Sequence, residues 1–259
     1  YDVEHLIETK MRPYQTEGAS WLVDRSLRFG GGLLADDMGL GKTLQAIALS
    51  EYLFSQAEPL HPILVVATAS LLGNWRNEFR KFAPGRTVRI LHGNGREKEQ
   101  AKVAPGEVIL TTFATLPRDL AWYLKREFQA VIVDEASLMR NPDTDHAKAI
   151  SRLKTGVRIA LTGTPIENGV RDLWSIFRFI QPGWLGSRED FRNRYELQTG
   201  DSFAMERLRL KVSPFLLRRT KEEVAPELPS KIQSEEICEL TSEQQSVYED
   251  LLAEGRKRV

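Results

Sequence analysis

The sequence predicts an α/β fold with a central, mostly parallel β-sheet that is flanked by helices. Short runs of apolar and β-branched residues alternate with amphipathic segments through residue 180. Several of these runs are apolar throughout, which is typical of parallel strands covered on both faces. In addition, a glycine-rich stretch joins the first apolar run to the first helical segment. Folds of this class bind ligands at the carboxyl ends of their strands.

The expected elements follow one another along the chain. Strands are expected at Leu33–Ala35, Ile63–Ala67, Val88–Leu91, Val108–Phe113, Ala130–Val133 and Val157–Leu161. Helices are expected at Lys42–Phe54, Leu71–Phe82, Leu120–Phe128, Thr144–Leu153 and Val170–Ile180. In the second of these helices the apolar residues recur about every 3.6 residues, which predicts one buried face. Trp75 lies on that face, so we interpret it as a core residue.

The pattern changes after residue 180, where Pro182-Gly183 interrupts it. The remainder reads as a mostly helical and strongly charged extension. Residues 206–221 carry six basic side chains against one acid, whereas residues 222–254 carry ten acids against Lys231 alone. The basic stretch is either a solvated face or an element that contacts phosphates. We therefore predict three segments, namely 1–180 as a nucleotide-binding lobe, 181–230 as a helical connector and 231–259 as the beginning of a further segment.

The composition narrows the possible functions. The chain has 259 residues, of which 41% are hydrophobic, and its formal net charge is zero, so nucleic acid would have to bind at a local patch. The single Cys238 excludes disulfides within the chain. No apolar run approaches the roughly 18 residues of a membrane span, and we expect no membrane partner. Because the chain begins with Tyr1, we expect it to be a piece of a longer protein.

The glycine-rich stretch is Asp36-Asp37-Met38-Gly39-Leu40-Gly41-Lys42-Thr43. Its glycines allow phosphate oxygens to approach backbone N–H groups at a helix N-terminus, where the partial positive charge favours anions. Lys42 is predicted to reach the β- and γ-phosphates of ATP, and the Thr43 hydroxyl to coordinate Mg²⁺. Asp36 departs from the strict pattern, which has glycine at that position. Taken alone, this stretch is also compatible with an ordinary glycine turn beside a surface lysine.

A second polar cluster follows the strand expected at Ala130–Val133. Asp134 and Glu135 come directly after that strand. We predict that Asp134 holds the metal and that Glu135 orients and deprotonates the attacking water. Another strand ends in Leu161-Thr162-Gly163-Thr164-Pro165. The hydroxyls of Thr162 and Thr164 either sense the γ-phosphate or form the turn before Pro165.

Together these motifs resemble the first RecA-like lobe of a Swi/Snf-type ATPase, a class of duplex-DNA translocases in helicase superfamily two. The resemblance covers most of the chain. The matching residues are Met11–Gln15 with Gly18 and Trp21 (adenine motif), Asp36–Thr43 (phosphate loop), Ser70–Trp75 (motif Ia), Asp134–Ala136 (motif II), Leu161–Asn168 (motif III), Asp172–Ser175 and Pro214–Lys221. The last two groups are specific to this branch and are absent from ordinary strand-separating helicases.

The resemblance implies roles for residues outside the phosphate loop. It implies that Gln15 reads the adenine edge and that Arg12 supports this pocket or the phosphates. It also implies sequence-independent contacts to the DNA backbone by small polar groups, and the residues concerned are Ser70, Asn74, Thr111 and Thr112. For the two threonines, a purely structural role at a strand end is the open alternative.

Two positions depart from the family's motifs. Ser137 stands where motif II usually has histidine, and Thr68 where motif Ia usually has proline. That histidine helps to link the nucleotide state to motif III and the second lobe, so Ser137, Thr162 and Thr164 are predicted as coupling residues.

The expected function is an ATPase lobe of a double-stranded-DNA translocase or remodeller, with ATP and Mg²⁺ as cofactors. The expected partners are double-stranded DNA, the second RecA-like lobe of the same parent and proteins that bind through further domains. The family's arginine finger lies in that second lobe and contributes roughly 10³–10⁵ in turnover in related enzymes. The isolated chain is therefore expected to bind Mg·ATP weakly and hydrolyse it very slowly. The expected location is intracellular, in the cytoplasm or nucleoid or in the nucleus.

Two alternatives remain open at this point. The same chemistry serves strand-separating helicases, although the Pro214–Lys221 motif argues against one. The chain could also be a catalytically idle module that senses nucleotide or docks on DNA, and Ser137 gives that alternative some support.

Overall fold

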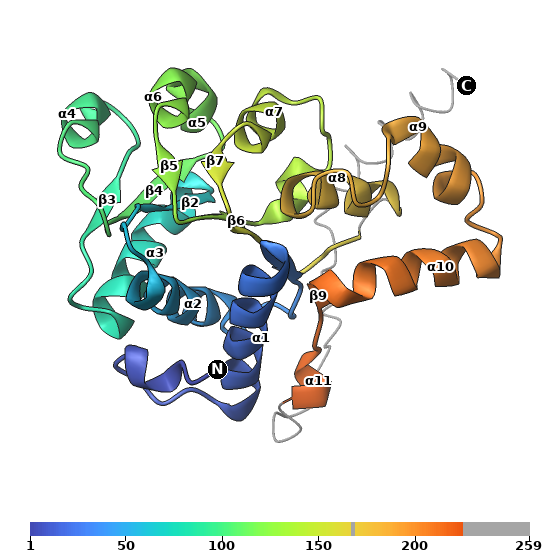
Figure 1. Cartoon of the computed structure of the whole chain (residues 1–259), viewed down its shortest axis with the longest axis horizontal. Coiled ribbons are helices and arrows are strands. Elements are labelled where there is room, and N and C mark those ends of the chain that lie inside the picture. The colour runs from blue at the N-terminus through green and yellow to red at the C-terminus, as the bar shows by residue number, and fades with distance from the viewer. Residues whose placement is uncertain (167–168, 225–259) are drawn as a thin grey trace, which may run out of the picture. The chain divides into compact units, whose positions relative to one another are not determined.

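A computed structural model describes residues 1–166 and 169–224, which fold around a seven-stranded sheet (Figure 1). Its strands are β1 (Gly31–Leu34), β2 (Ile63–Ala67), β3 (Val88–Ile90), β4 (Val108–Thr112), β6 (Ala130–Asp134), β8 (Arg158–Leu161) and β9 (Leu216–Leu217). The strand order is β3-β4-β2-β6-β8-β1-β9, and every neighbouring pair is parallel. The predicted mostly parallel sheet is thus confirmed.

Helices cover both faces of this sheet. They are α1 (Pro13–Phe29), α2 (Lys42–Gln56), α3 (Ala69–Phe82), α4 (Arg96–Gln100), α5 (Thr115–Arg118), α6 (Leu120–Leu124), α7 (Asp145–Ser151), α8 (Arg171–Ile180), α9 (Arg188–Phe191), α10 (Ser202–Val212) and α11 (Lys221–Val224). Helices α1, α2 and α3 pack on one face, whereas α5, α7 and α8 pack on the other (Figure 1). This arrangement is the doubly wound architecture that the sequence predicts.

The two layers of helices explain why the central strands are apolar without alternation. In β2, Leu64 and Val66 contribute to the hydrophobic cluster under α5, α7 and α8. Ile63 and Val65, which point the other way, contribute to the cluster under α1, α2 and α3. Because successive side chains of a strand point to opposite faces, a strand between two layers needs apolar residues at every position.

One predicted helix is too long. The helix expected at Leu120–Phe128 ends at Leu124, and Glu127–Phe128 form a short strand, β5, that pairs with β7 (Lys154–Thr155). The chain leaves the helix because Phe128 is buried in the core beside β6 and its backbone pairs with Thr155. Tertiary contacts therefore override the local helical pattern.

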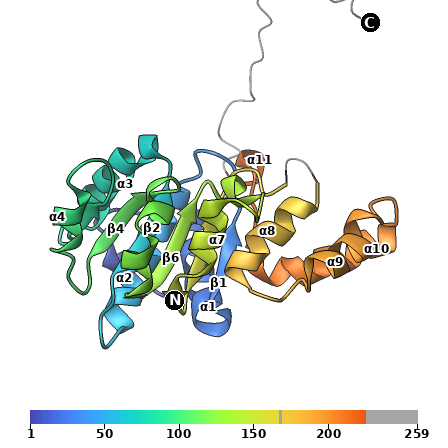
Figure 2. The ribbon, with the colours of Figure 1, turned by 90° about the horizontal axis from the view of Figure 1, so that it is seen from above.

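The segment after residue 180 contains helices, as predicted, but it also completes the sheet. β9 pairs with the outer edge of β1, with Leu216 opposite Leu33 and Leu217 opposite Leu34. Phe215, which precedes β9, belongs to the same hydrophobic cluster as Phe177 of α8. The break in the sequence pattern at residue 180 is therefore not a break in packing. The described residues form one compact unit, and Figure 2 shows α8, α9 and α10 following one another at the β1 end of the sheet.

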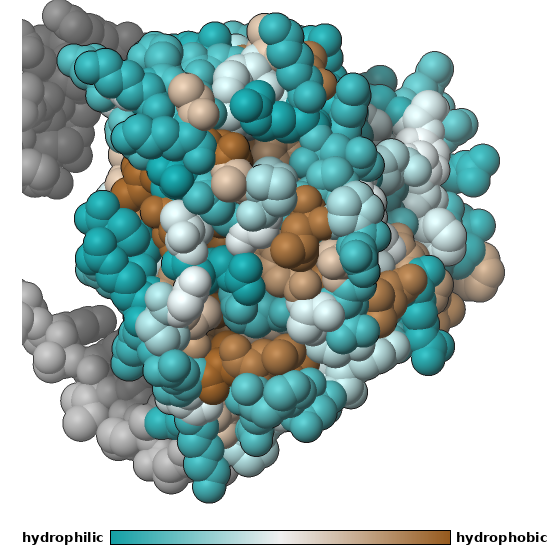
Figure 3. All heavy atoms as spheres, turned by 60° about the vertical axis from the view of Figure 1, so that its left-hand side comes forward, coloured by the Kyte–Doolittle hydropathy of each residue, from teal (hydrophilic) through white to brown (hydrophobic). Residues whose placement is uncertain are grey.

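Parts of the sequence-based predictions lie outside the described residues. These are the segment 231–259, the end of the connector after residue 224, and Glu167 and Asn168 of motif III. Within the described part of the chain, no helix has both the length and the apolar character needed to cross a membrane. Figure 3, which brings the side of β3 and α4 forward, shows a largely hydrophilic surface with separate hydrophobic patches.

Candidate active site

The carboxyl ends of three adjacent strands lie side by side at one edge of the sheet. In the order β6-β8-β1, Leu161 pairs with Asp134 on one side and with Leu34 on the other. Neighbouring strands lie about 4.8 Å apart, so the loops that follow β1 and β6 begin about 10 Å apart. This edge therefore brings together the glycine loop (residues 36–41), the Asp134–Glu135 pair and the residues that follow β8.

The glycine loop has backbone angles that favour glycine. Gly39 has a φ of 86° and Gly41 a φ of 80°, both in the left-handed region. A Cβ atom on Gly41 would come within 2.4 Å of the Gln15 Nε2, so the Gln15 side chain would have to move to admit one. Lys42, the next residue, begins the 15-residue helix α2. The loop thus precedes a helix N-terminus, where backbone N–H groups bind anions.

The other loop residues differ in their exposure. Leu40 is buried, and its N–H donates to the Asp37 carbonyl at 3.3 Å, which closes a turn. Met38 at the tip of the loop is 71% exposed, and its Cγ would lie 3.0 Å from a Cβ atom on Gly163. Thr43 is half-buried in the first turn of α2. The loop therefore packs against the segment that follows β8.

Lys42 lies within electrostatic reach of the predicted catalytic acids. Its Nζ donates to the Asp36 carbonyl at 2.7 Å and to the Asp37 carbonyl at 3.3 Å. Burial lowers the pKa of Lys42 below its ordinary value, and the attraction of Asp134 and Glu135, among other acids, opposes this change. Coulombic attraction weakens with distance. The effect of these acids on Lys42 therefore indicates that the glycine loop and the Asp134–Glu135 pair lie near one another.

Asp134 is the last residue of β6 and is only 8% exposed. The Trp75 Nε1 donates to its Oδ2 at 2.8 Å, and the Glu135 N–H donates to its Oδ1 at 2.9 Å. Burial raises the pKa of Asp134, whereas these two hydrogen bonds and Lys42 oppose the rise. Each carboxylate oxygen accepts more than one bond, so both oxygens keep acceptor capacity for a cation.

Glu135 has a strained backbone. Its φ of 52° is positive, and among the described residues no other non-glycine residue has a positive φ. Such a conformation costs about 1–3 kcal/mol and is typically found at functional sites. A short 3₁₀ helix, Ala136–Met139, follows immediately. The strain supports a chemical role for Glu135, which is what its position after β6 predicts.

The residues after β8 adopt the turn that is one of their two predicted roles. Thr162 is fully buried, and its hydroxyl accepts a hydrogen bond from the Thr164 N–H at 3.1 Å. The Thr162 N–H donates to the Leu34 carbonyl at 3.1 Å, which joins this segment to β1. A Cβ atom on Gly163 would lie 3.8 Å from the Lys42 Nζ. Motif III is therefore close to Lys42, and the coupling roles of Thr162, Thr164 and the half-buried Ser137 stay predictions.

Gln15 connects the start of α1 to the glycine loop. Its Nε2 donates to the Leu40 carbonyl at 3.2 Å, and its Oε1 accepts from the Arg12 N–H at 3.0 Å. Arg12 is exposed just before α1. Gln15 thus links Arg12 to the glycine loop, while adenine recognition by Gln15 stays a prediction.

The oxygen donors at this edge fit magnesium. Mg²⁺ prefers oxygen ligands and is usually bound by one or two carboxylates, waters and substrate phosphates. Asp134 provides a carboxylate at the end of β6, and Thr43 a hydroxyl in the first turn of α2. These two residues would hold the ion together with the phosphates of a nucleotide.

The four predicted DNA contacts divide into two groups. Ser70 and Asn74 are exposed in the first half of α3, and the Ser70 hydroxyl lies 3.1 Å from that of Thr68. Thr111 and Thr112 are buried. The Thr111 hydroxyl donates to the Leu91 carbonyl at 3.0 Å, and the Thr112 hydroxyl donates to that of Thr115 at 2.8 Å. This geometry favours the structural role for Thr111 and Thr112, and it leaves Ser70 and Asn74 available to DNA.

Two residues have roles that the sequence does not reveal. Trp75 is a core residue, as predicted, but its indole N–H also holds Asp134. Arg219 belongs to the basic stretch that one prediction assigns to phosphate contact, yet it is only 8% exposed and pairs with Asp36. That prediction is wrong for Arg219, because its guanidinium is already buried against a carboxylate. The one feature of the sequence that indicates this ion pair is Asp36, a charged residue at a position where the strict phosphate-loop pattern has glycine.

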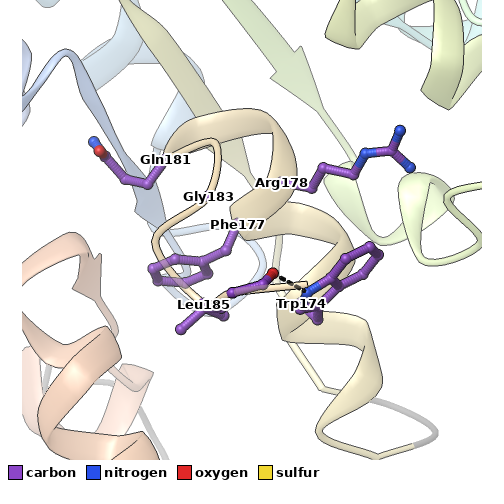
Figure 4. Close-up of a pocket in the computed structure, with 7 residues that line it drawn as sticks. Trp174, Phe177, Arg178, Gln181, Gly183 and Leu185 are labelled. Atoms are coloured by element: carbon purple, nitrogen blue, oxygen red, sulfur yellow. Dashed lines mark hydrogen bonds between the residues drawn. The ribbon is translucent and has the colours of Figure 1, made fainter. Parts of the chain in front are cut away.

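A small pocket elsewhere in the structure does not compete with this site. It lies between α8 and the turn that follows it and is lined in part by Trp174, Phe177 and Leu185 (Figure 4). The Trp174 Nε1 donates to the Gly186 carbonyl at 3.2 Å beside it. Its volume of about 30 Å³ is far below the roughly 300–1,000 Å³ of ligand pockets, so it does not hold a nucleotide.

Replacing Trp75 with phenylalanine is expected to raise the Mg²⁺ concentration needed for ATP binding by about 10–100-fold, as for other groups that orient metal ligands. Phenylalanine preserves most of the packing but removes the N–H that holds the Asp134 carboxylate. Titrating Mg²⁺ into the 259-residue chain with a fluorescent ATP analogue measures the change.

Trp174→Phe is the matched control, since it also removes a buried indole hydrogen bond but lies away from the site. We expect it to leave the Mg²⁺ titration unchanged. Equal titration curves for Trp75→Phe and the wild-type chain would show that the Trp75–Asp134 hydrogen bond does not support metal binding.

Known proteins are similar to this chain in both sequence and structure. An uncharacterized ATP-dependent helicase of Mycoplasma genitalium is 39% identical over 252 residues, covering 96% of this chain and 24% of that protein. The TATA-binding protein-associated factor MOT1 of Saccharomyces cerevisiae is 34% identical over 271 residues, covering 94% of this chain and 14% of the yeast protein.

A solved structure shares the fold as well. The SWI2/SNF2 ATPase core of Sulfolobus solfataricus in complex with double-stranded DNA is 41% identical, with a TM-score of 0.80 over 96% of this chain and 54% of that one. The chain thus spans about a quarter of the Mycoplasma protein and about half of the Sulfolobus core. The sequence profile of the SNF2-related domain matches residues 14–258. This chain therefore belongs to the SNF2-related domain family, and its sheet is that of a RecA-like ATPase lobe.

Proposed function

We propose that this chain is the first RecA-like lobe of an ATP-driven translocase or remodeller of double-stranded DNA. The observation that carries the proposal is that Lys42 and the acids Asp134 and Glu135 lie at the same carboxyl edge of one parallel sheet, within electrostatic reach of one another. A cation, a metal-binding carboxylate and a candidate base at such an edge are what hydrolysis of a nucleoside triphosphate requires. The similarity to a Sulfolobus SWI2/SNF2 core solved with double-stranded DNA supports the choice of substrate.

In the proposed reaction each residue has a defined task. Lys42 binds the β- and γ-phosphates and stabilises their negative charge, while the glycine loop presents its N–H groups to the same oxygens. Thr43 and Asp134 hold Mg²⁺, which when bound neutralises charge on the phosphates. Glu135 orients the attacking water and accepts its proton. Gln15 binds the adenine edge of ATP, and Arg12 supports that pocket or the phosphates.

The proposed DNA contacts lie on α3. Ser70 and Asn74 are exposed there, and small polar groups of this kind bind phosphate oxygens without reading bases. Trp75 follows Asn74 directly and bonds to Asp134, so this helix connects the proposed DNA surface with the metal site. Translocation needs the second RecA-like lobe of the parent protein, which supplies the arginine finger, and protein partners would bind through further domains. We place this activity where cellular DNA is found, in the nucleoid or nucleus.

The choice between a duplex translocase and a strand-separating helicase can be tested with the two-lobed protein, by which we mean the protein that carries this chain and the second lobe. We expect its ATP hydrolysis to be stimulated more by duplex DNA than by single strands of the same sequence and length. Steady-state release of phosphate measures both rates. Greater stimulation by single strands would instead indicate a strand-separating helicase.

A variant pair tests the DNA surface in the same assay. Ser70→Ala/Asn74→Ala should raise the duplex concentration needed for half-maximal stimulation, because it removes both proposed phosphate contacts, and it should leave the DNA-free rate unchanged. Ser55→Ala/Gln56→Ala is the matched control, since these residues are exposed at the opposite end of α2 from the glycine loop. If both variant pairs behave alike, the N-terminal half of α3 is not the DNA surface.

A further inference from the structure

Asp36 places a buried negative charge at the beginning of the glycine loop. Its side chain is fully buried, and it occupies the position at which the strict phosphate-loop pattern has glycine. A carboxylate that is buried without a partner is strongly destabilising because it has lost its hydration. The loop can therefore keep Asp36 only if another group supplies a positive charge.

Arg219 supplies that charge from a position 183 residues further along the chain. Its Nε donates to the Asp36 Oδ1 at 3.0 Å, and its Nη2 donates to the Oδ2, which is the two-pronged geometry in which arginine binds a carboxylate best. The Nη2 also donates to the Gln45 Oε1 at 2.9 Å, and the Nη1 donates to the Tyr14 carbonyl. Arg219 thus joins α1, the glycine loop and α2 at one buried point.

The backbone on either side of Arg219 also forms hydrogen bonds with the end of β1 and with the glycine loop. The Leu217 carbonyl of β9 accepts from the Ala35 N–H at 2.7 Å, and the Arg219 carbonyl accepts from the Asp37 N–H at 3.0 Å. The Lys221 N–H then donates to the Asp37 Oδ2 at 3.2 Å. The pairing between β9 and β1 therefore continues beyond the strands and into the loop. This segment supports the first half of the loop from outside.

This support acts on the residues that orient Lys42. The Lys42 Nζ donates to the carbonyls of Asp36 and Asp37, which are the two residues that Arg219 holds through its side chain and its carbonyl. Binding groups must be held within about 0.5 Å of their productive geometry. A loop with two left-handed glycines needs contacts from neighbouring residues to keep such a geometry. The position of the Lys42 ammonium thus depends on contacts made by Arg219.

We propose that Arg219 is a positioning residue for the nucleotide phosphates. Through Asp36 it holds the glycine loop and Lys42 in the geometry that binds Mg·ATP, and it ties the loop to the segment that continues into α11. This inference rests on the proposed function, since it requires the loop to bind nucleotide. A displacement of that segment would therefore also displace the glycine loop at the phosphate site.

The decisive variant removes both charges together. Arg219→Met alone leaves the buried Asp36 carboxylate without an opposite charge and with only the Gln45 amide as a side-chain donor, so it is expected to unfold the chain. Asp36→Asn/Arg219→Met removes both charges of this ion pair, which avoids the large cost of leaving one of them buried without an opposite charge. We expect this double variant of the two-lobed protein to unfold at nearly the wild-type temperature, but its KM for Mg·ATP should rise by about 10–100-fold, because small misplacements of binding groups have effects of this size. Its kcat should fall by a smaller factor.

The chain offers a matched control pair. The Arg86 Nε and Nη2 donate to the two carboxylate oxygens of Glu51, and the Nη1 donates to the Gly106 carbonyl. This is the same type of ion pair, but it makes no contact with the glycine loop. Glu51→Gln/Arg86→Met is therefore expected to leave the KM unchanged. Arg219→Lys keeps the charge beside Asp36 but loses the two-pronged contact, so its KM should lie between those of the wild type and the decisive variant.

The possible outcomes separate this inference from the proposed function. A wild-type KM in a stably folded Asp36→Asn/Arg219→Met variant would overturn the positioning role. If that variant does not fold, Arg219→Lys decides, and a wild-type KM for it would overturn the role equally. Failure of the wild-type protein itself to bind Mg·ATP, as judged against Lys42→Ala, would overturn the proposed function instead.

Discussion

Lys42→Ala is expected to reduce ATP hydrolysis by the two-lobed protein at least about 10²–10³-fold, which is the effect of removing one preorganised group that stabilises charge. The ammonium group is held at the loop by the carbonyls of Asp36 and Asp37. Alanine removes this cation, which neutralises negative charge on the triphosphate in the proposed reaction. Phosphate release at saturating duplex DNA, together with titration of a fluorescent ATP analogue, measures the losses of activity and of affinity.

The control for this experiment is Lys148→Ala, which removes an exposed lysine of α7 and should change neither quantity. Duplex binding by Lys42→Ala, measured without nucleotide, is expected to match the wild type. If the wild-type protein binds DNA but has no ATPase activity for Lys42→Ala to remove, the chain is an idle docking or sensing module. Activity that survives the loss of Lys42 would contradict the assignment of the phosphate site.

Glu135→Gln is expected to lower kcat by about 10²–10⁴-fold, the usual contribution of a general base, while the affinity for Mg·ATP stays near that of the wild type. Glutamine preserves the size of the side chain and its hydrogen-bonding atoms but cannot accept the proton of the attacking water. Single-turnover hydrolysis, measured alongside nucleotide binding, should therefore show ATP that is bound and not cleaved. Lys42→Ala and Glu135→Gln thus separate binding from chemistry.

Glu127→Gln serves as the control, because Glu127 is an exposed glutamate of β5 and is expected to have no effect. A thermal melt of Glu135→Gln checks that the variant folds as stably as the wild type. Two results would count against the assigned role. Hydrolysis near the wild-type rate would show that Glu135 is not the base, and loss of nucleotide affinity would assign it to binding.

Most of the sheet could be predicted because its strands lie between two layers of helices. Ile63–Ala67 and Ala130–Asp134 are buried at every position, so Ile63–Ala67 and Ala130–Val133 appear in the sequence as uninterrupted apolar runs. The glycine loop could be predicted because the left-handed backbone at Gly39 and Gly41 favours one residue type. Burial and backbone geometry therefore leave a local signal.

The missed features depend on long-range contacts that leave no local signal. β9 is two residues long, too short to show any periodicity, and its partner lies near the other end of the chain. Helical periodicity placed Trp75 on the buried face but could not show that its indole N–H meets Asp134. A count of charges treats Arg219 as one more surface cation, and only the fold reveals its carboxylate partner.

The outermost strand also bears on how the chain acquires its structure. Leu34 of β1 is translated well before its partners Leu161 and Leu217. Until then, β1 has unpaired edges that can associate with other nascent chains. Distant parallel pairings also form slowly. We therefore expect dependence on chaperones to be greatest before residue 217 has been translated, with the phosphate loop among the last regions to become ordered.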